Sequence, residues 1–433
     1  MNAAHTPYAR ALARLLSLQR FGVRPGLETT RAALAAVGDP QRSLQVVHVT
    51  GSNGKGSTAA FTERILREAG YTTGLFTSPH LSRFTERIRI AGEEISEEEL
   101  AALTDRVLAL PLELTLFEAV TVMAFLVFAE RAQVVVLEAG LGGRLDSTNV
   151  VDAPLCTVVT GVALDHTDVL GDTLTAIARE KAGIWKAHAP AVMACRDQGA
   201  RQVLLDEAAR AGAPAYLLGR DFSLTASAGA YAYEGPGGAL AFDSLGLRGV
   251  HQHDNAALAL AGAALAGERL GAPISDEARR RGLANVRWPG RLESLTDDVL
   301  VDAAHNPDGA RTLAAELPSL AAGRSVTIVL GMAADKDVAG VLARLRPLAQ
   351  RLIVTRPPSP RALPPEQLRA LAPEAEIFDA PSDALPAARG PGTLTVVAGS
   401  IFLVAEARRL VLGEPTDPLF VQDPAVARPP KVV

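Results

Sequence analysis

The stretch that decides the fold of this chain is Thr50-Gly51-Ser52-Asn53-Gly54-Lys55-Gly56-Ser57-Thr58. Residues 44–49 before it are mostly apolar and predict a short strand, and the apolar spacing of residues 57–69 after it predicts a helix. A strand, a glycine-rich turn and a helix N-terminus bring unpaired backbone N–H groups and the positive end of the helix dipole to one point. Glycine allows the backbone to wrap closely around a phosphate. The stretch therefore predicts a phosphate-binding loop.

Two side chains of this loop have predicted roles. Lys55 is expected to reach the outer phosphates of a nucleotide, and the hydroxyl of Ser57 or Thr58 to hold Mg²⁺. The spacing differs from the standard Walker A motif, because only two residues separate Gly51 from Gly54. The alternative is an ordinary glycine turn before a helix, which the strand and helix patterns on either side disfavour.

The composition of the chain excludes several classes of protein. Its 433 residues suffice for two or three domains, and 48% hydrophobic with 21% charged residues is ordinary for a soluble globular protein. A net charge of −5 argues against nucleic-acid binding. The two cysteines, Cys156 and Cys195, predict neither a disulfide framework nor a cysteine zinc site. Apolar runs such as residues 119–129 are too short to span a membrane and no secretory signal is visible, so we expect a cytoplasmic protein.

Lysine is scarce in this chain. Only five of the 43 basic residues are lysine, although lysine and arginine serve equally well on a solvated surface. We therefore expect a lysine that is present to be needed for its compact ammonium or its nucleophilic amine. Lys55, Lys181 and Lys336 all lie in motifs, which marks them as functional candidates.

Strand and helix patterns alternate along the chain, which predicts an α/β fold with mostly parallel sheets. The predicted strands after the phosphate loop are residues 134–137, 155–160, 299–301, 325–330, 351–355 and 394–397. A helix is predicted from a cap at Asp172 or Thr173 to Lys181. The segment 287–291 is a candidate linker between domains. From Glu414 onward the chain carries five prolines, so we expect poor order there.

Polar side chains follow two of the predicted strands, at the edge where parallel α/β sheets bind ligands. Glu138 ends one of these strands, where a phosphate-loop enzyme needs a carboxylate for Mg²⁺, and His166 follows the next. Lys181 lies near a helix C-terminus, and Ser78 offers a hydroxyl on another loop. Alone, the first three could be a solvated strand end, a capped core histidine and a lysine that satisfies the helix dipole. Together with a phosphate loop they predict a metal-dependent nucleotide site.

The ordered series of motifs resembles the folylpolyglutamate synthase/dihydrofolate synthase family of the Mur ligase superfamily. The resemblance extends from about Tyr8 to Leu412. Its matching segments are residues 48–58, 76–81, 86–88, 117–118, 138–150, 164–167, 180–184, 251–252, 255, 288–293, 302–307, 335–337 and 399–400. The chain departs from the family pattern at Ser52, Ala139 and Ser147, and of these only Ser147 touches the expected pterin loop.

The resemblance implies both an architecture and a reaction. It implies an N-terminal P-loop domain with a mostly parallel sheet over residues 1–287, a C-terminal Rossmann-like α/β domain over residues 288–413, and then the proline-rich tail, residues 414–433. The implied activity is that of an ATP-dependent ligase that joins L-glutamate to the carboxylate of a pterin or folate. In this family the γ-phosphate of ATP passes to the carboxylate, and the glutamate amine attacks the acyl phosphate. Such a site needs positive charge around the transferring phosphoryl group.

The resemblance also implies roles for individual residues. The expected catalytic residues are Lys55, His166 and Lys181. The expected ATP contacts are Gly51, Asn53, Gly54, Lys55, Gly56, Ser57, Asn255, Arg291, Asp302 and His305. The expected ligands of two Mg²⁺ ions are Ser57 with Glu138, His166 with a carbamylated Lys181, and Ser78. The expected pterin or folate contacts are Thr115, Phe117, Glu118, Leu145, Asp146 and Ser147.

Some of these residues have alternative interpretations. Carbamylation of Lys181 needs a neutral amine, whereas a helix C-terminus favours the ammonium, so burial and the metal must outweigh the dipole. Asn255 begins an alanine-rich segment and could be a helix N-cap. Arg291 could form an interdomain salt bridge, and Lys336 could belong to a solvated charge cluster instead of the glutamate or domain-closure side.

Two other functions fit parts of the pattern. A peptidoglycan Mur ligase uses the same chemistry on a UDP-sugar peptide, but it carries a UDP-binding domain before the phosphate loop, and we expect none within the 50 residues that precede Gly51. A P-loop regulatory module needs neither His166 nor Lys181 nor a second α/β domain.

Within the resembled family, the sequence leaves the acceptor open: it could be dihydropteroate, a reduced folate, or both. We expect a monomer whose partners are small molecules, with no nucleic acid and no membrane.

Overall fold

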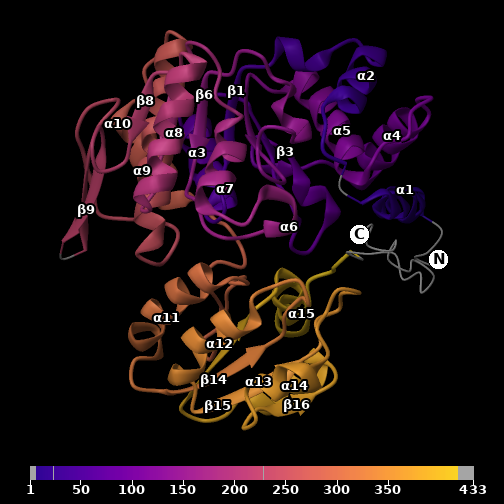
Figure 1. Ribbon diagram of the computed structural model, residues 1–433, viewed down its shortest axis with the longest axis vertical. Helices are drawn as coiled ribbons and strands as arrows, with labels where there is room; N and C mark the ends of the chain where they lie inside the picture. Colours follow the sequence, from indigo (N-terminus) through magenta and orange to yellow (C-terminus); the bar gives the residue numbers. More distant parts are fainter. Residues whose placement is uncertain (1–5, 23, 228, 418–433) are drawn as a thin grey trace.

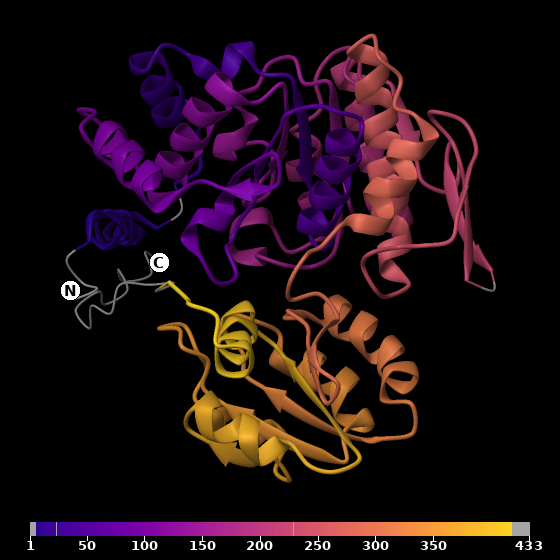
Figure 2. The ribbon, with the colours of Figure 1, turned by 180° about the vertical axis from the view of Figure 1, so that it is seen from behind.

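The computed structural model describes residues 6–22, 24–227 and 229–417. It shows two α/β domains stacked one on the other, each with a central sheet between layers of helices (Figure 1, Figure 2). The predicted α/β class with mostly parallel sheets is confirmed. Within the described residues, no helix combines the length and the apolar character needed to cross a membrane.

The N-terminal domain is built on an eight-stranded sheet with the order β4-β3-β2-β5-β1-β6-β7-β8. Its strands are β1 (Val46–Thr50), β2 (Thr73–Phe76), β3 (Ile88–Ile90), β4 (Glu93–Glu94), β5 (Val134–Glu138), β6 (Cys156–Val159), β7 (Ala191–Met193) and β8 (Ala215–Leu217). Six neighbouring strands, β2, β5, β1, β6, β7 and β8, are parallel to one another. Only β3 and β4 run antiparallel to their neighbours. The carboxyl ends of β1, β5 and β6 therefore meet at one edge of the sheet, facing the second domain.

Side chains of alternate strand residues point to opposite faces of this sheet, so each face packs against its own set of helices. Val47 and Val49 belong to the core under α3, α9 and α10, whereas Val46 belongs to the core under α1, α2, α4 and α5. The helices of the domain are α1 (Pro7–Ser17), α2 (Glu28–Ala36), α3 (Lys55–Glu68), α4 (Glu97–Leu108), α5 (Leu116–Arg131), α6 (Thr167–Leu170), α7 (Leu174–Ala182), α8 (Gln198–Ala211), α9 (His251–Arg269) and α10 (Asp276–Asn285). Beside α9 lies a small antiparallel sheet of β9 (Ser223–Ser227), β10 (Ala230–Glu234) and β11 (Leu240–Phe242).

The C-terminal domain repeats the layered plan with a six-stranded sheet of order β12-β13-β17-β14-β15-β16. Its strands are β12 (Glu293–Thr296), β13 (Val299–Val301), β14 (Ser325–Leu330), β15 (Arg351–Thr355), β16 (Glu376–Phe378) and β17 (Thr393–Ala398). Its helices are α11 (Pro307–Ala321), α12 (Val338–Leu345) and α13 (Pro365–Leu371) on one face, and α14 (Pro381–Ala388) and α15 (Ile401–Leu412) on the other. Only β12 is antiparallel.

Local sequence signals explain where the helices nearest the site begin. Thr173 caps α7, because its hydroxyl accepts a hydrogen bond from the Ala176 backbone N–H, as the sequence predicts for one of its two candidate caps. Asn306 caps α11 in the same way, with Pro307 at the first helical position. The helix after the phosphate loop begins at Lys55, two residues before the predicted start.

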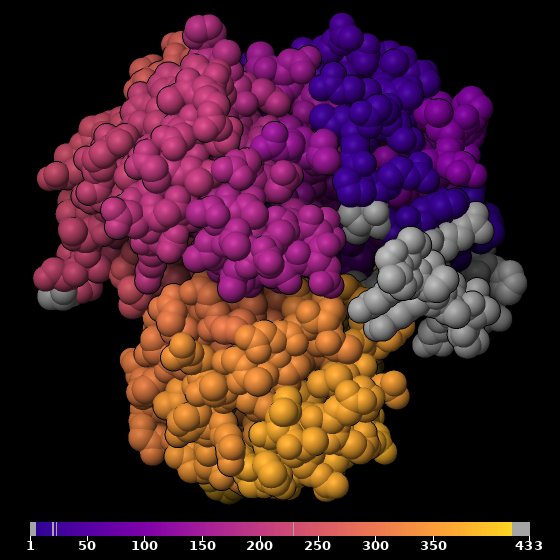
Figure 3. Space-filling view, in the orientation of Figure 1, coloured from indigo at the N-terminus to yellow at the C-terminus, as the bar shows by residue number. Residues whose placement is uncertain are grey.

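The two domains touch directly as well as through the chain that joins them. Leu81 of the N-terminal domain packs into the apolar cluster of the C-terminal domain, close to Val404 and to the linker residue Gly290. Figure 3 shows the orange C-terminal domain pressed against the magenta part of the N-terminal domain. This apolar contact joins the two domains beside the linker.

The first residues of the proline-rich tail return to the N-terminal domain. Asp417 accepts hydrogen bonds from the Phe84 backbone N–H at 2.8 Å, from Tyr8 and from Arg83, and its own N–H donates to the Ser82 carbonyl at 2.8 Å. The described start of the tail therefore contacts the N-terminal domain through Asp417, and the expectation of poor order stays a prediction. The rest of the tail, residues 418–433, lies outside the described residues.

Candidate active site

The phosphate loop connects β1 to α3 and is braced from the next strand. Gly51 and Gly54 adopt positive φ angles of 154° and 85°, which other residues rarely take. The Thr160 hydroxyl donates to the Asn53 carbonyl at 2.6 Å, and a Cβ added to Gly51 would overlap this hydroxyl. The glycines are therefore required by the shape of the loop and by the close approach of its neighbours.

The lysine of the loop is held inside it. The Lys55 ammonium donates to the carbonyls of Gly51, at 3.0 Å, and Ser52, at 3.3 Å. A Cβ on Gly56 would lie 2.8 Å from the indole nitrogen of Trp288, so the interdomain linker packs directly on the start of α3. The loop is thus preformed. The Lys55 ammonium is bound by two carbonyl oxygens, and the charged oxygens of a phosphate would bind it more strongly.

The C-terminal domain reaches the loop through the start of α11. The Asn53 amide donates to Asp308 at 3.0 Å, and the Asn306 amide donates to the Asn53 side-chain oxygen at 3.0 Å. The N-terminus of this 15-residue helix therefore faces the phosphate loop, where its dipole favours an anion.

Asn255 supports the loop from behind. It is the fifth residue of α9, which begins at His251, so the N-cap interpretation is wrong. Its side-chain oxygen accepts from Thr58 at 3.3 Å, and its amide donates to Gln252 at 2.8 Å. A Cβ on Gly54 would overlap Asn255, so this side chain packs against the turn itself.

Glu138 is a buried carboxylate at the end of β5. One of its oxygens accepts a hydrogen bond from the Ser78 backbone N–H at 3.2 Å. Burial raises the pKa of Glu138 to about 7, although the charges of Lys55 and Arg291 oppose the rise. Glu138, Ser78 and Arg291 line one small cavity, and Arg291 forms no salt bridge with any described residue. The interdomain salt bridge expected as an alternative for Arg291 is therefore not formed.

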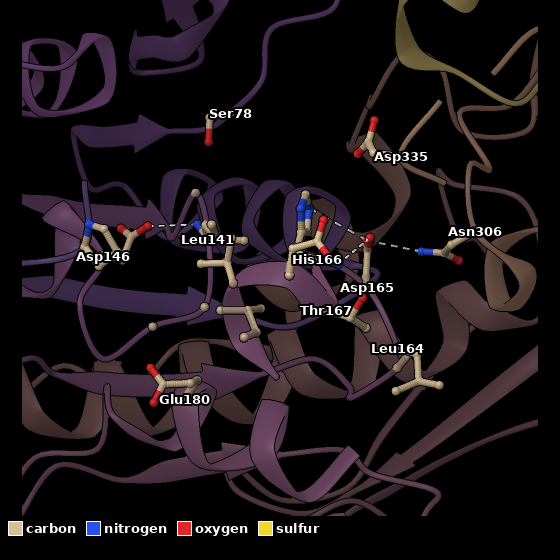
Figure 4. Close-up of a pocket in the computed structure, with 18 of the residues that line it drawn as sticks. Ser78, Leu141, Asp146, Leu164, Asp165, His166, Thr167, Glu180, Asn306 and Asp335 are labelled. Atoms are coloured by element: carbon tan, nitrogen blue, oxygen red, sulfur yellow. Dashed lines mark hydrogen bonds and ion pairs between the residues drawn. The ribbon is translucent and has the colours of Figure 1, made fainter. Parts of the chain in front are cut away.

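His166 sits in a left-handed turn, with φ of 51°, at the end of the loop that follows β6. Burial lowers the pKa of His166 to about 4 against the opposing charge of Asp165, so its imidazole is neutral at pH 7 and available as a ligand. The Asp165 carboxylate lies between His166, whose Nε2 is 3.9 Å from it, and Asn306 of the C-terminal domain (Figure 4). The same carboxylate accepts from Lys336 at 2.7 Å and contacts His305 at 3.4 Å.

Lys181 is buried near the end of α7, with 2% of its surface exposed. Burial, helped by the charge of Lys55, lowers the pKa of its ammonium to about 7. About half of the amine is therefore neutral at neutral pH, and burial outweighs the helix dipole that favours the ammonium. A neutral amine is the form that reacts with carbon dioxide to give a carbamate.

A cavity of about 1130 Å³ lies between the domains. The predicted residues that line it are Ser78, Thr115, Phe117, Leu145, Asp146, Ser147 and His166. Lys336 and Asn306 line it from the C-terminal side, and several apolar residues of the 162–174 segment form one wall (Figure 4). The cavity is large enough for an aromatic substrate and joins the candidate metal ligands to the candidate ring contacts.

Some predicted residues lie outside this cavity wall. Glu118 instead forms a capping box with Thr115 at the start of α5, with contacts at 2.7 and 3.2 Å. Asp302 accepts from the backbone N–H groups of Leu292 and Ala304, both at 2.9 Å, and so fixes the linker to the end of β13. These side chains shape the site through the backbone.

Comparison with known proteins identifies the family. Residues 49–263 match the model described as the Mur ligase middle domain, and residues 290–401 match the Mur ligase, glutamate ligase domain. The chain is 36% identical over 430 residues to the dihydrofolate synthase/folylpolyglutamate synthase of Bacillus subtilis, which covers 93% of this chain and 99% of that protein. The chain belongs to the folylpolyglutamate synthase/dihydrofolate synthase family. The resemblance seen in the sequence is thereby confirmed.

Solved structures of the family superpose on the whole chain. Escherichia coli FolC in complex with DHPP and ADP has a TM-score of 0.87 and 33% identity, and the match covers 95% of this chain and 99% of that one. The bifunctional folylpolyglutamate synthase/dihydrofolate synthase of Yersinia pestis, complexed with AMPPNP and a Mn ion, has a TM-score of 0.85 and 33% identity over 94% of this chain and 98% of that one.

The residues at the site are compatible with divalent metal. Among the described residues, no three histidine, cysteine, aspartate or glutamate side chains gather into a metal cage. Mg²⁺ does not need one, because it commonly keeps several waters and takes one or two protein ligands beside substrate phosphates. Glu138 is a buried carboxylate without an ion-pair partner among the described residues, and His166 presents a neutral imidazole. Both donors suit a metal held jointly with a nucleotide.

Three residues that were quoted only as parts of matching segments prove central to the geometry. Asp165 and Asn306 join the domains, and Arg87 lines the large cavity. Asp165 directly precedes the predicted ligand His166 at a strand end, a position from which it could have been singled out. Arg87 carried no such signal, because its burial depends on contacts far from it in the sequence.

Proposed function

We propose that this protein ligates L-glutamate to the carboxylate of a pterin or folate, using ATP and passing through an acyl phosphate. The observation that supports this most strongly is the large cavity between the domains. It brings Ser78 and His166, near the phosphate loop, together with Phe117 and Asp146 and with Lys336 of the other domain. A ligase needs such a meeting point, because ATP, acceptor and amine must come together away from bulk water.

The nucleotide is assigned to the loop and the face of the C-terminal domain opposite it. Lys55 would exchange the carbonyls of Gly51 and Ser52 for the phosphates and stabilise the charge that develops on the transferring group. The other proposed ATP contacts are Gly51, Asn53, Gly54, Gly56, Ser57, Asn255, Arg291, Asp302 and His305. Of these, Asn255 and Asp302 act by holding the loop and the linker in place.

Two Mg²⁺ ions are part of the proposal, and they supply charge neutralisation on the phosphates. Ser57, Glu138 and Ser78 would hold one ion, and His166 with a carbamylated Lys181 the other. The lowered pKa of Lys181 supports the carbamate, since it leaves neutral amine available at pH 7. Without that modification, a cationic Lys181 near Lys55 would oppose a metal instead of binding it.

The ring system of the acceptor is assigned to the wall formed by Thr115, Phe117, Leu145, Asp146 and Ser147. Phe117 offers an aromatic face, and Leu145 is a large apolar side chain that is 44% exposed, which a bound ring would cover. Both oxygens of Asp146 accept hydrogen bonds within its own loop, so its first role is to shape that loop. Glu118 contributes through the capping box.

The experiment that tests the proposal is ADP release from MgATP, measured with and without L-glutamate, and with dihydropteroate and tetrahydrofolate in parallel. Glutamate-dependent release with both acceptors establishes a bifunctional enzyme, and release with one assigns the branch. ATP hydrolysis that ignores glutamate and acceptor would favour a regulatory module instead. The proposal also includes a monomeric, cytoplasmic enzyme, for which sedimentation of the purified protein and fractionation of cells are the tests.

A further inference from the structure

A buried arginine in the cavity wall lacks an anionic partner within the described residues. Arg87 ends the short 3₁₀ helix Phe84–Arg87, directly before β3, and lines the large cavity with Ser78 and Thr115. It is only 9% exposed. Its guanidinium donates one hydrogen bond to a described residue, from Nε to the Nδ1 of His80 at 2.9 Å, and no described carboxylate lies within ion-pair distance. Both Nη groups are therefore left for the cavity.

His80 fixes the direction of this guanidinium. Its ring is buried and packs against Phe84 in a tilted arrangement, with the ring centroids 5.2 Å apart. The Phe84 ring in turn lies 5.0 Å from the Arg87 guanidinium carbon. The Nδ1 of His80 is the acceptor of the hydrogen bond from the Arg87 Nε–H, so this nitrogen carries no proton. The Nε2 of His80 has no partner among the described residues. The ring therefore has no other hydrogen bond that would compete for its position.

An unpaired buried cation is costly unless a ligand supplies the missing anion. Burial lowers the pKa of Arg87 only to about 10, so the side chain stays charged at neutral pH. Glu138 is near enough to interact with this charge, but its carboxylate is bonded to the Ser78 N–H and makes no ion pair with Arg87. The planar fork of two Nη groups matches a carboxylate in size and geometry.

The position of Arg87 suits one part of the substrate. Phe117 lines the same cavity on the side assigned to the ring system, and Ser78 lines both this cavity and the smaller one that contains Glu138. The acceptor carboxylate must lie between its ring and the phosphoryl site, because it receives the phosphate. Arg87 lines the same cavity as Phe117, and its charge interacts with Glu138 of the proposed metal site.

We propose that Arg87 binds the carboxylate of the pterin or folate acceptor through its two Nη groups, and that His80 is the positioning residue that orients it. This inference rests on the proposed function. It gives the cavity a specific contact that distinguishes a carboxylate acceptor from an uncharged pterin.

The test compares the binding of dihydropteroate with that of its carboxamide analogue, by calorimetry in the absence of ATP. We expect the unaltered protein to prefer the carboxylate by about 10- to 100-fold, as for a charged hydrogen-bonded contact. Arg87→Met should reduce this preference to about one, while the carboxamide itself binds as before. His80→Ala should lower the preference part of the way, since the guanidinium is retained but no longer held.

Two further variants keep the test decisive. Arg279→Met removes another buried arginine, one that pairs with Asp276 away from the cavity, and should leave the preference unchanged. If Arg87→Met fails to fold, Arg87→Lys keeps the charge without the fork and should still weaken the preference.

The outcomes separate the inference from the proposed function. An unchanged preference in folded Arg87 variants overturns the role of Arg87. Equal binding of the carboxylate and the carboxamide by the unaltered protein also overturns the role of Arg87, but it leaves the proposed pterin site intact. Binding of neither ligand by a protein that binds ATP rejects the proposed function, and this inference with it.

Discussion

Lys336 donates a hydrogen bond to the Asp165 carboxylate at 2.7 Å, and this ion pair joins the two domains at the large cavity between them. Both side chains are largely buried, with 13% and 8% of their surfaces exposed. His305 and Asn306 approach the same carboxylate from the C-terminal domain, each at 3.4 Å. One aspartate beside the candidate ligand His166 therefore contacts three residues of the C-terminal domain.

Lys336→Ala should favour the open arrangement of the domains. Removing one member of a largely buried pair costs about 3 kcal/mol or more, because the other charge stays desolvated. We expect kcat/KM for glutamate to fall about 10- to 100-fold, with ATP affinity changed much less. Small-angle scattering with nucleotide bound should show a larger particle. The exposed pair of Arg351 with Glu376 offers a control, since Arg351→Ala should leave both measurements unchanged. Unchanged kinetics in Lys336→Ala would refute the role of Lys336 in closing the two domains.

Lys181→Ala should abolish ligation and leave ATP binding largely intact. The pKa of Lys181 is about 7, so the neutral amine that forms a carbamate becomes more abundant as pH rises through 7. Activation by added bicarbonate should accordingly need less bicarbonate at about pH 8 than at about pH 6. Short carboxylic acids should partly restore ligation in the alanine variant by replacing the carbamate. Ligation at the normal rate in that variant, without bicarbonate or acid, would remove the carbamate from the account.

Glu138→Gln should stabilise the metal-free protein and inactivate it. The folded protein raises the pKa of Glu138 from 4.5 to about 7, so the native state holds this proton more tightly than the unfolded state does. The stability that this group contributes is fully present below about pH 4.5 and is lost as pH rises through about 7, a loss of about 3 kcal/mol. The glutamine variant escapes that loss, so its free energy of unfolding at pH 8 should exceed that of the unaltered protein.

Magnesium provides the matched control for Glu138. It should raise the unfolding temperature of the unaltered protein at pH 8, because it binds the ionised carboxylate of the native state, and should do so much less in Glu138→Gln. Equal effects of magnesium on both proteins would argue against Glu138 as a metal ligand.

Asp417→Ala should weaken the attachment of the C-terminal segment to the N-terminal domain. The aspartate ties Tyr8, Arg83 and the Phe84 backbone together, and its loss leaves these donors without that acceptor. We expect a loss of about 1–3 kcal/mol in the free energy of unfolding, measured by urea denaturation. Glu406→Ala, which removes only a surface partner of Arg409, should cost much less.

Much of the fold could be predicted from the sequence because its signals are local. The strand, glycine turn and helix around Lys55 indicate a phosphate loop wherever they occur together, and the cap at Thr173 indicates the start of α7. The expected order of strands and helices follows from alternating patterns of the same kind. The contact of Asp417 with Tyr8 could not be predicted, because the two residues lie about 400 positions apart and proline content says nothing of such partners.

The candidate site was predictable to the extent that its residues end strands. Glu138 and His166 follow β5 and β6, so the parallel sheet brings them to one edge. The partners that set their chemistry are distant in sequence and could not be read from it. The place of Arg87 in the cavity wall depends on residues such as Thr115, although its hydrogen-bond partner His80 is only seven residues away. The lowered pKa of Lys181 comes from burial that only the folded chain creates.

The most direct test of the central claim uses dihydropteroate whose carboxylate carries heavy oxygen. The labelled acceptor is incubated with ATP, Mg²⁺ and L-glutamate, and both the organic product and the phosphate are analysed by mass spectrometry. The account predicts glutamate-dependent formation of dihydrofolate, with one labelled oxygen transferred from the carboxylate to each phosphate released. Phosphate without the label, or ADP release without a glutamylated product, would contradict it.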